Sequence, residues 1–136
     1  MKITLIKIPK ILSQKGNLAF LEEETHLPFR IKRAYWIYDI PAGEPRGGHA
    51  HKDLFQIIIA IRGSFNVILD DGNCRKKAKL KESDFGLLIK PGIWREITNF
   101  SNGAICLVLA SDKFHESDYI REYSTFLRYK NDPSLS

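Results

Sequence analysis

Apolar and polar residues alternate with a period of two along most of the chain, which is typical of β-strands with one buried face. The segment 33–40 is aromatic and β-branched, and it ends at Pro41 and Gly43, which predict a turn. The segment 54–61 is a nearly continuous apolar strand, and Arg62-Gly63 predicts the next turn. The strands predicted in this way are 33–40, 54–61, 64–69, 85–89, 94–100 and 104–109.

Short turn signals separate these strands. Asp71-Gly72 predicts a two-residue hairpin. Many short strands with turns between them indicate an all-β sandwich or barrel. The segment 2–8 also alternates, and we expect an edge strand there that pairs with, or is exchanged with, another subunit.

One segment departs from the period of two. Between residues 116 and 129, apolar residues recur at three- and four-residue spacing, which predicts a single C-terminal amphipathic helix packed across the barrel. Its apolar positions are Tyr119, Ile120, Tyr123, Phe126 and Leu127. Ser111 or Ser117 is a candidate N-cap. We expect this stripe to serve core packing in preference to ligand binding, because apolar helix faces are normally buried.

The length and composition further limit the number of domains and the class of protein. A chain of 136 residues makes one domain of ordinary size, which we place at residues 1–130, with a polar tail at 131–136. Hydrophobic residues at 43% and charged residues at 27% indicate a folded chain. Its apolar runs fall short of the roughly 18–20 residues of a membrane-spanning helix, so no membrane association is expected.

The N-terminal alternation lacks the continuous apolar core of a signal peptide. Cys74 and Cys106 are the two cysteines, both placed in expected strands, which makes a disulfide framework improbable. These features predict a cytoplasmic protein with two free thiols.

The net charge of +5 raises the question of a polyanionic partner. The densest basic cluster has period two, so its cations share one strand face with apolar residues on the other. Its cations are Arg75, Lys77, Lys79 and Lys81, and the apolar positions are Ala78 and Leu80. Lysines on an exposed or edge strand protect against aggregation, so we expect this function and no nucleic-acid partner.

The candidate catalytic and binding residues are most concentrated in the block 45–52, which reads Pro-Arg-Gly-Gly-His-Ala-His-Lys. His49 and His51 stand at i and i+2, so on a strand they point to the same face. The two glycines allow backbone or ligand to approach closely. Gln56 follows soon after.

This pattern resembles the cupins, which are small jelly-roll barrels. His49 and His51 occupy the paired histidine positions of their first motif, and Gln56 lies near its glutamate. In the second motif, Arg95 stands where cupins have a histidine ligand. Neutral Gln56 and cationic Arg95 replace metal ligands, and Arg has no lone pair to donate. We therefore expect a cupin pocket without a metal or other cofactor.

Two histidines free of metal titrate near neutrality and suit proton transfer. Around them, cations and aromatic residues suggest an anionic ligand. Arg33, Arg46 and Lys52 are candidates for an anionic group, because arginine grips phosphate oxygens in bidentate fashion. Tyr35 and Trp94 offer a stacking face and hydrogen-bond donors, although wall packing is the alternative for both.

Over nearly its whole length the chain resembles the dTDP-4-oxo-6-deoxyglucose 3,4-ketoisomerases. The matching segments are residues 31–39, 46–52, 68–72, 91–96, 108–112 and 116–121, with Gln56. The Arg-Gly-X-His-Ala-His-Lys block is specific, whereas the Asp-Asp-Gly hairpin is not. The resemblance implies a metal-free homodimeric cupin that moves a ketone from C4 to C3 of a dTDP-linked 4-keto-6-deoxy sugar. It also implies that a pyridoxal-phosphate aminotransferase uses the product for a 3-amino sugar of surface polysaccharide or a natural product.

From these residues we expect His49 to be the principal base, with His51 as a proton shuttle or orienting partner. Arg95 or Tyr35 would stabilise the enolate oxygen. Arg33 and Arg46 would clamp the diphosphate, with Lys52, Gln56 and Trp94 as further substrate-binding residues.

Some members of this family have His where this chain has Arg95, and such a change could alter the face on which C4 is reprotonated. We favour the gluco product. Two other classes stay open: a metal-dependent cupin epimerase or oxygenase, which would bind stoichiometric metal, and a non-catalytic nucleotide-sugar-binding cupin, which would be stabilised by ligand without turnover.

Overall fold

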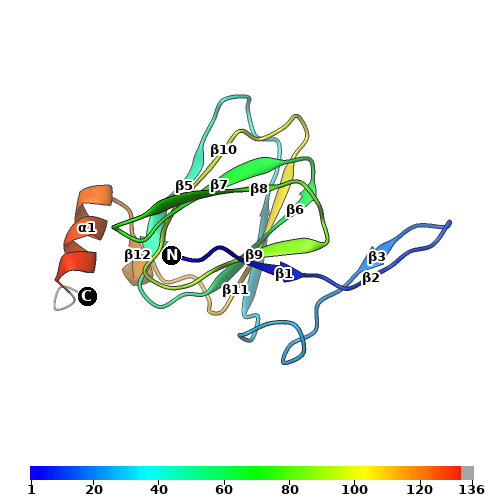
Figure 1. The fold of residues 1–136 in the computed structure, drawn as a ribbon, viewed down its shortest axis with the longest axis horizontal. Helices are drawn as coiled ribbons and strands as arrows, with labels where there is room; N and C mark the ends of the chain where they lie inside the picture. The colour runs from blue at the N-terminus through cyan, green and yellow to red at the C-terminus, as the bar shows by residue number, and fades with distance from the viewer. Residues whose placement is uncertain (133–136) are drawn as a thin grey trace.

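The computed structural model describes residues 1–132, which fold into two antiparallel five-stranded sheets that face each other as a barrel (Figure 1). One sheet has the strand order β1-β9-β6-β11-β4 and the other β12-β5-β10-β7-β8, and β2 and β3 form a separate hairpin. The strands are β1 (Thr4–Lys7), β2 (Lys10–Ile11), β3 (Leu18–Ala19), β4 (Arg33–Ile37), β5 (Arg46–His51), β6 (Gln56–Arg62), β7 (Phe65–Asp70), β8 (Arg75–Leu80), β9 (Phe85–Ile89), β10 (Trp94–Thr98), β11 (Ile105–Ala110) and β12 (Tyr119–Ile120). The expected all-β class and barrel with a C-terminal helix are confirmed.

The position of strand β6 in the fold explains why its sequence is almost continuously apolar. It lies in the middle of its sheet, between β9 and β11. Ile58 and Ala60 face the barrel interior, in a core cluster built from both sheets. Ile57 and Ile59 face the opposite way and pack under Leu27 and other residues of the loop before β4. Both faces of β6 are therefore buried, which removes the alternation seen elsewhere.

The basic strand lies where the sequence predicts. Strand β8 is the edge of its sheet and, within residues 1–132, pairs only with β7. Lys77 and Lys79 are exposed, while Ala78 and Leu80 are buried against the core. The cations therefore lie along an edge strand, which is a common protection against pairing of that edge with another chain.

The predicted helix over 116–129 is wrong in its first half. The 3₁₀ turn η1 (Glu116–Asp118) leads into β12, and the helix α1 spans Tyr123–Asn131. Tyr119 and Ile120 pair with His51 and Ala50 of β5, because the strand edge offers backbone hydrogen bonds that a longer helix would forgo.

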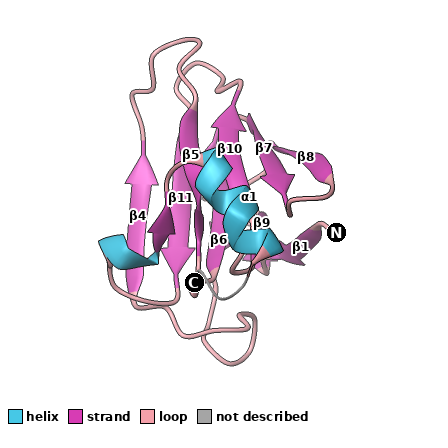
Figure 2. Ribbon diagram, turned by 90° about the vertical axis from the view of Figure 1, so that its left-hand side faces the viewer, coloured by secondary structure: helices cyan, strands magenta, loops and turns pink. Residues whose placement is uncertain are grey.

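The helix also begins without the expected serine cap. Its N-cap is Glu122, which makes no side-chain capping bond. The Ser111 hydroxyl instead accepts a hydrogen bond from the Phe55 amide, at 2.9 Å. Phe126 of α1 is fully buried beside Trp94, so the helix covers the outer face of β5 and β10 (Figure 2). Core packing is thus confirmed for Phe126.

The remaining sequence expectations concern termini and thiols. The predicted tail at 131–136 starts at the last residue of α1, and residues 133–136 lie outside the described residues. Cys74, which precedes β8, and Cys106 on β11 are both free thiols. Among the helices of residues 1–132, none has the length and apolar character needed to cross a bilayer.

Candidate active site

A bulge in β5 sets the position of the histidine pair. Arg95 of β10 is opposite His49, yet Ile97, two residues later, is opposite Arg46, three residues earlier. The extra residue of β5 is accommodated at Gly47, whose φ of +79° favours glycine. A Cβ on Gly47 would also lie 3.4 Å from Cγ1 of Ile97. The glycines of the block therefore serve a bulge that orients the following histidines.

A cavity of about 550 Å³ lies between the two sheets at this point. It is lined by six of the nine site residues predicted from the sequence, drawn from both sheets. These are Arg33 and Tyr35 on β4, Gln56 on β6, Arg46 and His49 on β5, and Arg95 on β10. The topology thus gathers into one cavity residues that are up to 62 positions apart in the chain, from 33 to 95.

Arg95 is a buried cation held by neutral oxygens. Its guanidinium donates to Oε1 of Gln56 and to the carbonyl of Ile93, and it is 1% exposed. The Gln56 amide in turn donates to the Tyr35 hydroxyl, at 3.1 Å. Burial lowers the pKa of Arg95 to about 10, so it stays protonated at neutral pH. Its hydrogen bonds within residues 1–132 go to no carboxylate, and its charge is available to an anionic ligand.

Both histidines are neutral at physiological pH, so the expectation that they titrate near neutrality is corrected. Burial, followed by the nearby Arg95 charge, lowers the pKa of His49 to about 2. The same two causes lower the pKa of His51 to about 3. The rings meet edge to face with centroids 4.8 Å apart, and each has a buried Nε2 without a hydrogen-bond partner in the structure. Each imidazole is therefore unprotonated and has one ring nitrogen with a lone pair that can accept a proton.

Burial raises the pKa of the Tyr35 phenol, so this hydroxyl also stays protonated and can donate. Tyr35 projects from the sheet opposite to the one that carries His49. The cavity therefore has a proton acceptor on one wall and a proton donor on the other.

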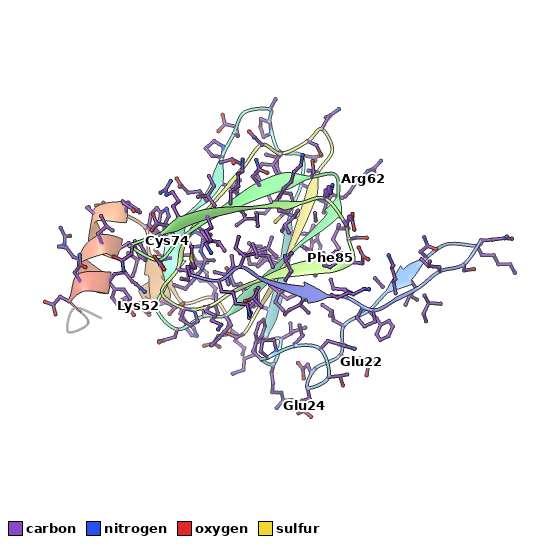
Figure 3. All side chains as sticks on the ribbon, viewed as in Figure 1. Glu22, Glu24, Lys52, Arg62, Cys74 and Phe85 are labelled. Atoms are coloured by element: carbon purple, nitrogen blue, oxygen red, sulfur yellow. The ribbon has the colours of Figure 1, made fainter. Side chains whose placement is uncertain are left out.

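Three predicted residues do not line this cavity. His51 and Lys52 line a neighbouring cavity of about 340 Å³, which shares Arg33 with the first, and Lys52 lies at the end of the barrel near α1 (Figure 3). Trp94 is 5% exposed and packs with Ala50 and Phe126 beneath α1. The alternative of wall packing therefore describes Trp94, and its expected contact with substrate is corrected, because its side chain faces away from the barrel interior.

The sequence interpretation missed three site residues at the end of η1 and directly after it. Tyr119 and Arg121 line the main cavity, and Asp118 contacts His51. The Tyr119 ring lies 5.0 Å from His49 and 4.2 Å from His51 between centroids, and the Arg121 guanidinium carbon lies 4.1 Å from the centroid of the Tyr119 ring. Their helical spacing concealed them, although the conspicuous Asp-Tyr-Ile sequence, with two strand-favouring residues, was a usable signal.

The cavity does not suit the metal that many cupins hold. The His49 ring lines the cavity with the His51 ring beside it, but the other two ligand positions are the amide Gln56 and the cation Arg95. A divalent ion beside a buried guanidinium would be repelled. Across residues 1–132, no group of three or more His, Cys, Asp or Glu side chains is arranged to hold a metal ion.

Comparisons with known proteins agree on one group. The family described as FdtA: WxcM-like, C-terminal matches residues 1–131. A TDP-4-oxo-6-deoxy-alpha-D-glucose-3,4-oxoisomerase of Aneurinibacillus thermoaerophilus is 43% identical over 129 residues, covering 95% of this chain and 93% of the relative.

Two crystal structures extend the likeness to the fold. A 3,4-ketoisomerase of Helicobacter canadensis is 44% identical with a TM-score of 0.94, covering 97% of this chain and 99% of the other. A TDP-quinovose 3,4-ketoisomerase of Campylobacter jejuni is also 44% identical, with a TM-score of 0.88 and coverage of 93% and 97%.

Proposed function

The chain belongs to the FdtA family of WxcM-like, C-terminal proteins, and we propose on this basis that it is a 3,4-ketoisomerase acting on dTDP-4-keto-6-deoxyglucose. The observation that carries the proposal is the pairing of neutral His49 with the buried cation Arg95 in one cavity. Removing a proton next to a ketone creates negative charge on oxygen, and this reaction needs both a base and a fixed positive charge.

The reaction can be written with these groups. His49 takes the proton from C3, the C–H electron pair forms a C3–C4 double bond, and the former C4 carbonyl oxygen becomes an enolate. Arg95 and Tyr35 stabilise this oxygen. The C3 hydroxyl proton passes through His51 to the C4 oxygen, the C3 carbonyl forms, and C4 takes a proton from the Tyr35 hydroxyl. Proton exchange with solvent then removes the proton from His49 and restores the one on Tyr35. The product is an isomer, so no electrons enter or leave.

The placement of Tyr35 supports the gluco product. In the gluco configuration the hydrogens on C3 and C4 lie on opposite faces of the ring, whereas in the galacto configuration they share a face. Tyr35 and His49 stand on opposite sheets, so a ring between them meets a base on one face and an acid on the other. The similarity to a TDP-quinovose 3,4-ketoisomerase agrees, since quinovose is 6-deoxyglucose.

The remaining cations fit the diphosphate. Arg33 lines both cavities, and Arg46 is exposed beside the main one. An anionic group held by Arg33 is within reach of Lys52, which lines the second cavity with it. We assign these three residues to the diphosphate and nucleoside part of the substrate, because guanidinium and ammonium groups bind phosphate oxygens.

The deciding experiment is incubation of the protein with dTDP-4-keto-6-deoxyglucose, followed by NMR of the product. A ketone at C3 with an equatorial C4 hydroxyl is expected, and an axial C4 hydroxyl would contradict the gluco assignment. Absence of any 3-keto product would contradict the activity itself. His49→Asn is the matched variant, for which we expect turnover to fall by about 10²-fold or more.

We also propose a homodimer. β1 is the free edge of its sheet, and the β2–β3 hairpin that follows projects away from the barrel (Figure 1). Ile11, Leu12 and Leu18 on this arm are 60%, 67% and 55% exposed. A second copy that pairs with this edge would cover both the backbone and these side chains.

Sedimentation analysis tests the dimer. The wild-type protein should sediment with twice the mass of the chain, and Leu12→Lys should shift it toward monomer because a charge is costly in an apolar contact. Ile61→Lys, at a 45% exposed site outside the arm, is the control. A wild-type monomer would refute the dimer.

We further propose a cytoplasmic setting in polysaccharide or natural-product biosynthesis. The free thiols of Cys74 and Cys106 suit a reducing compartment. A 3-keto sugar is a substrate for a pyridoxal-phosphate aminotransferase, so such an enzyme would consume the product. A coupled assay with a 3-aminotransferase should yield the amino sugar only when this protein is present.

A further inference from the structure

Asp118 is fixed in place beside His51 by three separate bonds. Its Oδ2 lies 2.9 Å from Nδ1 of His51. Its other oxygen, Oδ1, accepts a hydrogen bond from the Asp53 amide at 2.7 Å. Its backbone carbonyl accepts one from the Lys52 amide at 2.9 Å. The carboxylate is therefore held from both sides, and it is only 15% exposed.

This arrangement determines which nitrogen of His51 carries hydrogen. A neutral imidazole has one N–H and one lone pair, and an ionised carboxylate can only accept. The bond to Asp118 therefore requires the hydrogen on Nδ1 and leaves the lone pair on Nε2. That Nε2 is buried without a partner in the structure, and the ring lies 4.8 Å from His49 between centroids.

We propose that Asp118 is a positioning residue that fixes the Nδ1–H form of His51, so that the Nε2 lone pair can take the hydroxyl proton of the sugar. This inference rests on the proposed function. Asp118 also supplies the negative charge that balances an imidazolium while His51 carries the proton. Its charge matters here because Arg33, Arg95 and Arg121 surround His51 with positive charge.

The variant Asp118→Asn tests this proposal, because it should move the hydrogen of His51 from Nδ1 to Nε2. The Asp53 amide is an obligatory donor, so it takes the single carbonyl oxygen of the new side chain. The NH₂ group then faces Nδ1 of His51 and can only donate. His51 must accept at Nδ1 and carry its hydrogen on Nε2, which blocks the proposed acceptor. The size and the backbone bonds of residue 118 are unchanged.

We expect kcat of Asp118→Asn to fall by about 10²- to 10⁴-fold, the range seen when a catalytic histidine is held in the wrong tautomer. KM and the melting temperature should change little. Nitrogen-15 NMR of the imidazole should show hydrogen on Nδ1 of His51 in the wild-type protein and on Nε2 in the variant. Glu82→Gln, which removes an exposed carboxylate outside both cavities, is the control and should keep wild-type kcat.

Wild-type protein with hydrogen on Nε2 of His51 would overturn the proposal without any variant. An active Asp118→Asn enzyme, or an inactive one in which His51 keeps its hydrogen on Nδ1, would also overturn it. Failure of the wild-type protein to isomerise dTDP-4-keto-6-deoxyglucose would instead contradict the proposed function. The wild-type NMR spectrum tests the position of the hydrogen independently of turnover.

Discussion

Arg95 and His49 are register partners across β10 and β5, so a buried guanidinium stands beside the imidazole that faces the cavity. The cation has two effects. It keeps the imidazole neutral, by lowering the pKa of His49 together with burial. It also offers positive charge to an oxygen that becomes negative during the reaction. A single pair of residues thus prepares the base and stabilises the intermediate.

Replacement of Arg95 by Met should separate these effects. We expect kcat to fall by about 10²-fold, because the charge that stabilises the enolate is gone. The pKa of His49 should rise, because one of its two main depressing causes is removed. The wild-type rate should therefore show no acid limb between pH 5 and 8. In the variant the acid limb should begin at a higher pH than in the wild-type protein, because the Arg95 charge no longer lowers the pKa of His49.

The measurement is a pH profile of kcat/KM. Arg128→Met, on the exposed face of α1, is the matched control and should leave both rate and profile unchanged. A wild-type profile that already falls below pH 6.5 would contradict a neutral, strongly perturbed His49.

A stability test follows from the same burial. The folded pKa of His49 is about 2, below its unfolded value of 6.5, so below pH 6.5 the unfolded chain binds a proton that the folded chain does not. Stability is therefore lost as pH falls. From pH 7.5 to pH 5, this histidine alone should lower the free energy of unfolding by about 2 kcal/mol at most.

Urea unfolding at the two pH values checks this. The loss in His49→Asn should be smaller than in the wild-type protein by that amount. His115→Asn, at an exposed histidine, should lose as much as the wild type. Equal losses in all three proteins would show that His49 does not titrate differently in the folded and unfolded chains.

The sequence predicted the strands well because most of them keep one apolar face, and β6 was found because its run is apolar throughout. The site prediction named residues that the fold brings together where chemistry is concentrated, in the block that holds His49 and His51. It failed for Trp94. A period of two shows that Trp94 and Arg95 face opposite sides of β10. Because both sides of β10 are covered, this period does not show which of the two side chains faces the barrel interior.

Asp118 and Tyr119 were missed for a different reason. Apolar residues after position 116 happen to recur at helical spacing, and local spacing carries no information about an unpaired strand edge elsewhere in the chain. Tyr119 and Ile120 pair with the edge of β5 through their backbones, and the paired segments are about 70 residues apart in the chain. Tertiary context thus overrode a local pattern at the site itself.

Docking of α1 should depend mainly on Phe126, which is fully buried against Trp94. Phe126→Ala should destabilise the protein by about 3–5 kcal/mol, through lost burial and the cavity left behind. Thr125→Ala, on the exposed face of the helix, should change stability by less than about 0.5 kcal/mol. Urea unfolding measures both, and similar values for the two variants would contradict the packing described for the helix.

The corrected position of Trp94 can be tested against Tyr35. Trp94→Phe should lower the melting temperature, because a smaller ring then packs with Ala50 and Phe126 beneath α1. KM and kcat of this variant should stay close to wild type. Tyr35→Phe should do the opposite. It removes the hydroxyl that lies 3.1 Å from the Gln56 amide, so kcat should fall by about 10²-fold with little change in melting temperature. Steady-state kinetics and thermal unfolding of both variants separate the two roles, and a raised KM in Trp94→Phe at unchanged stability would return Trp94 to the substrate site.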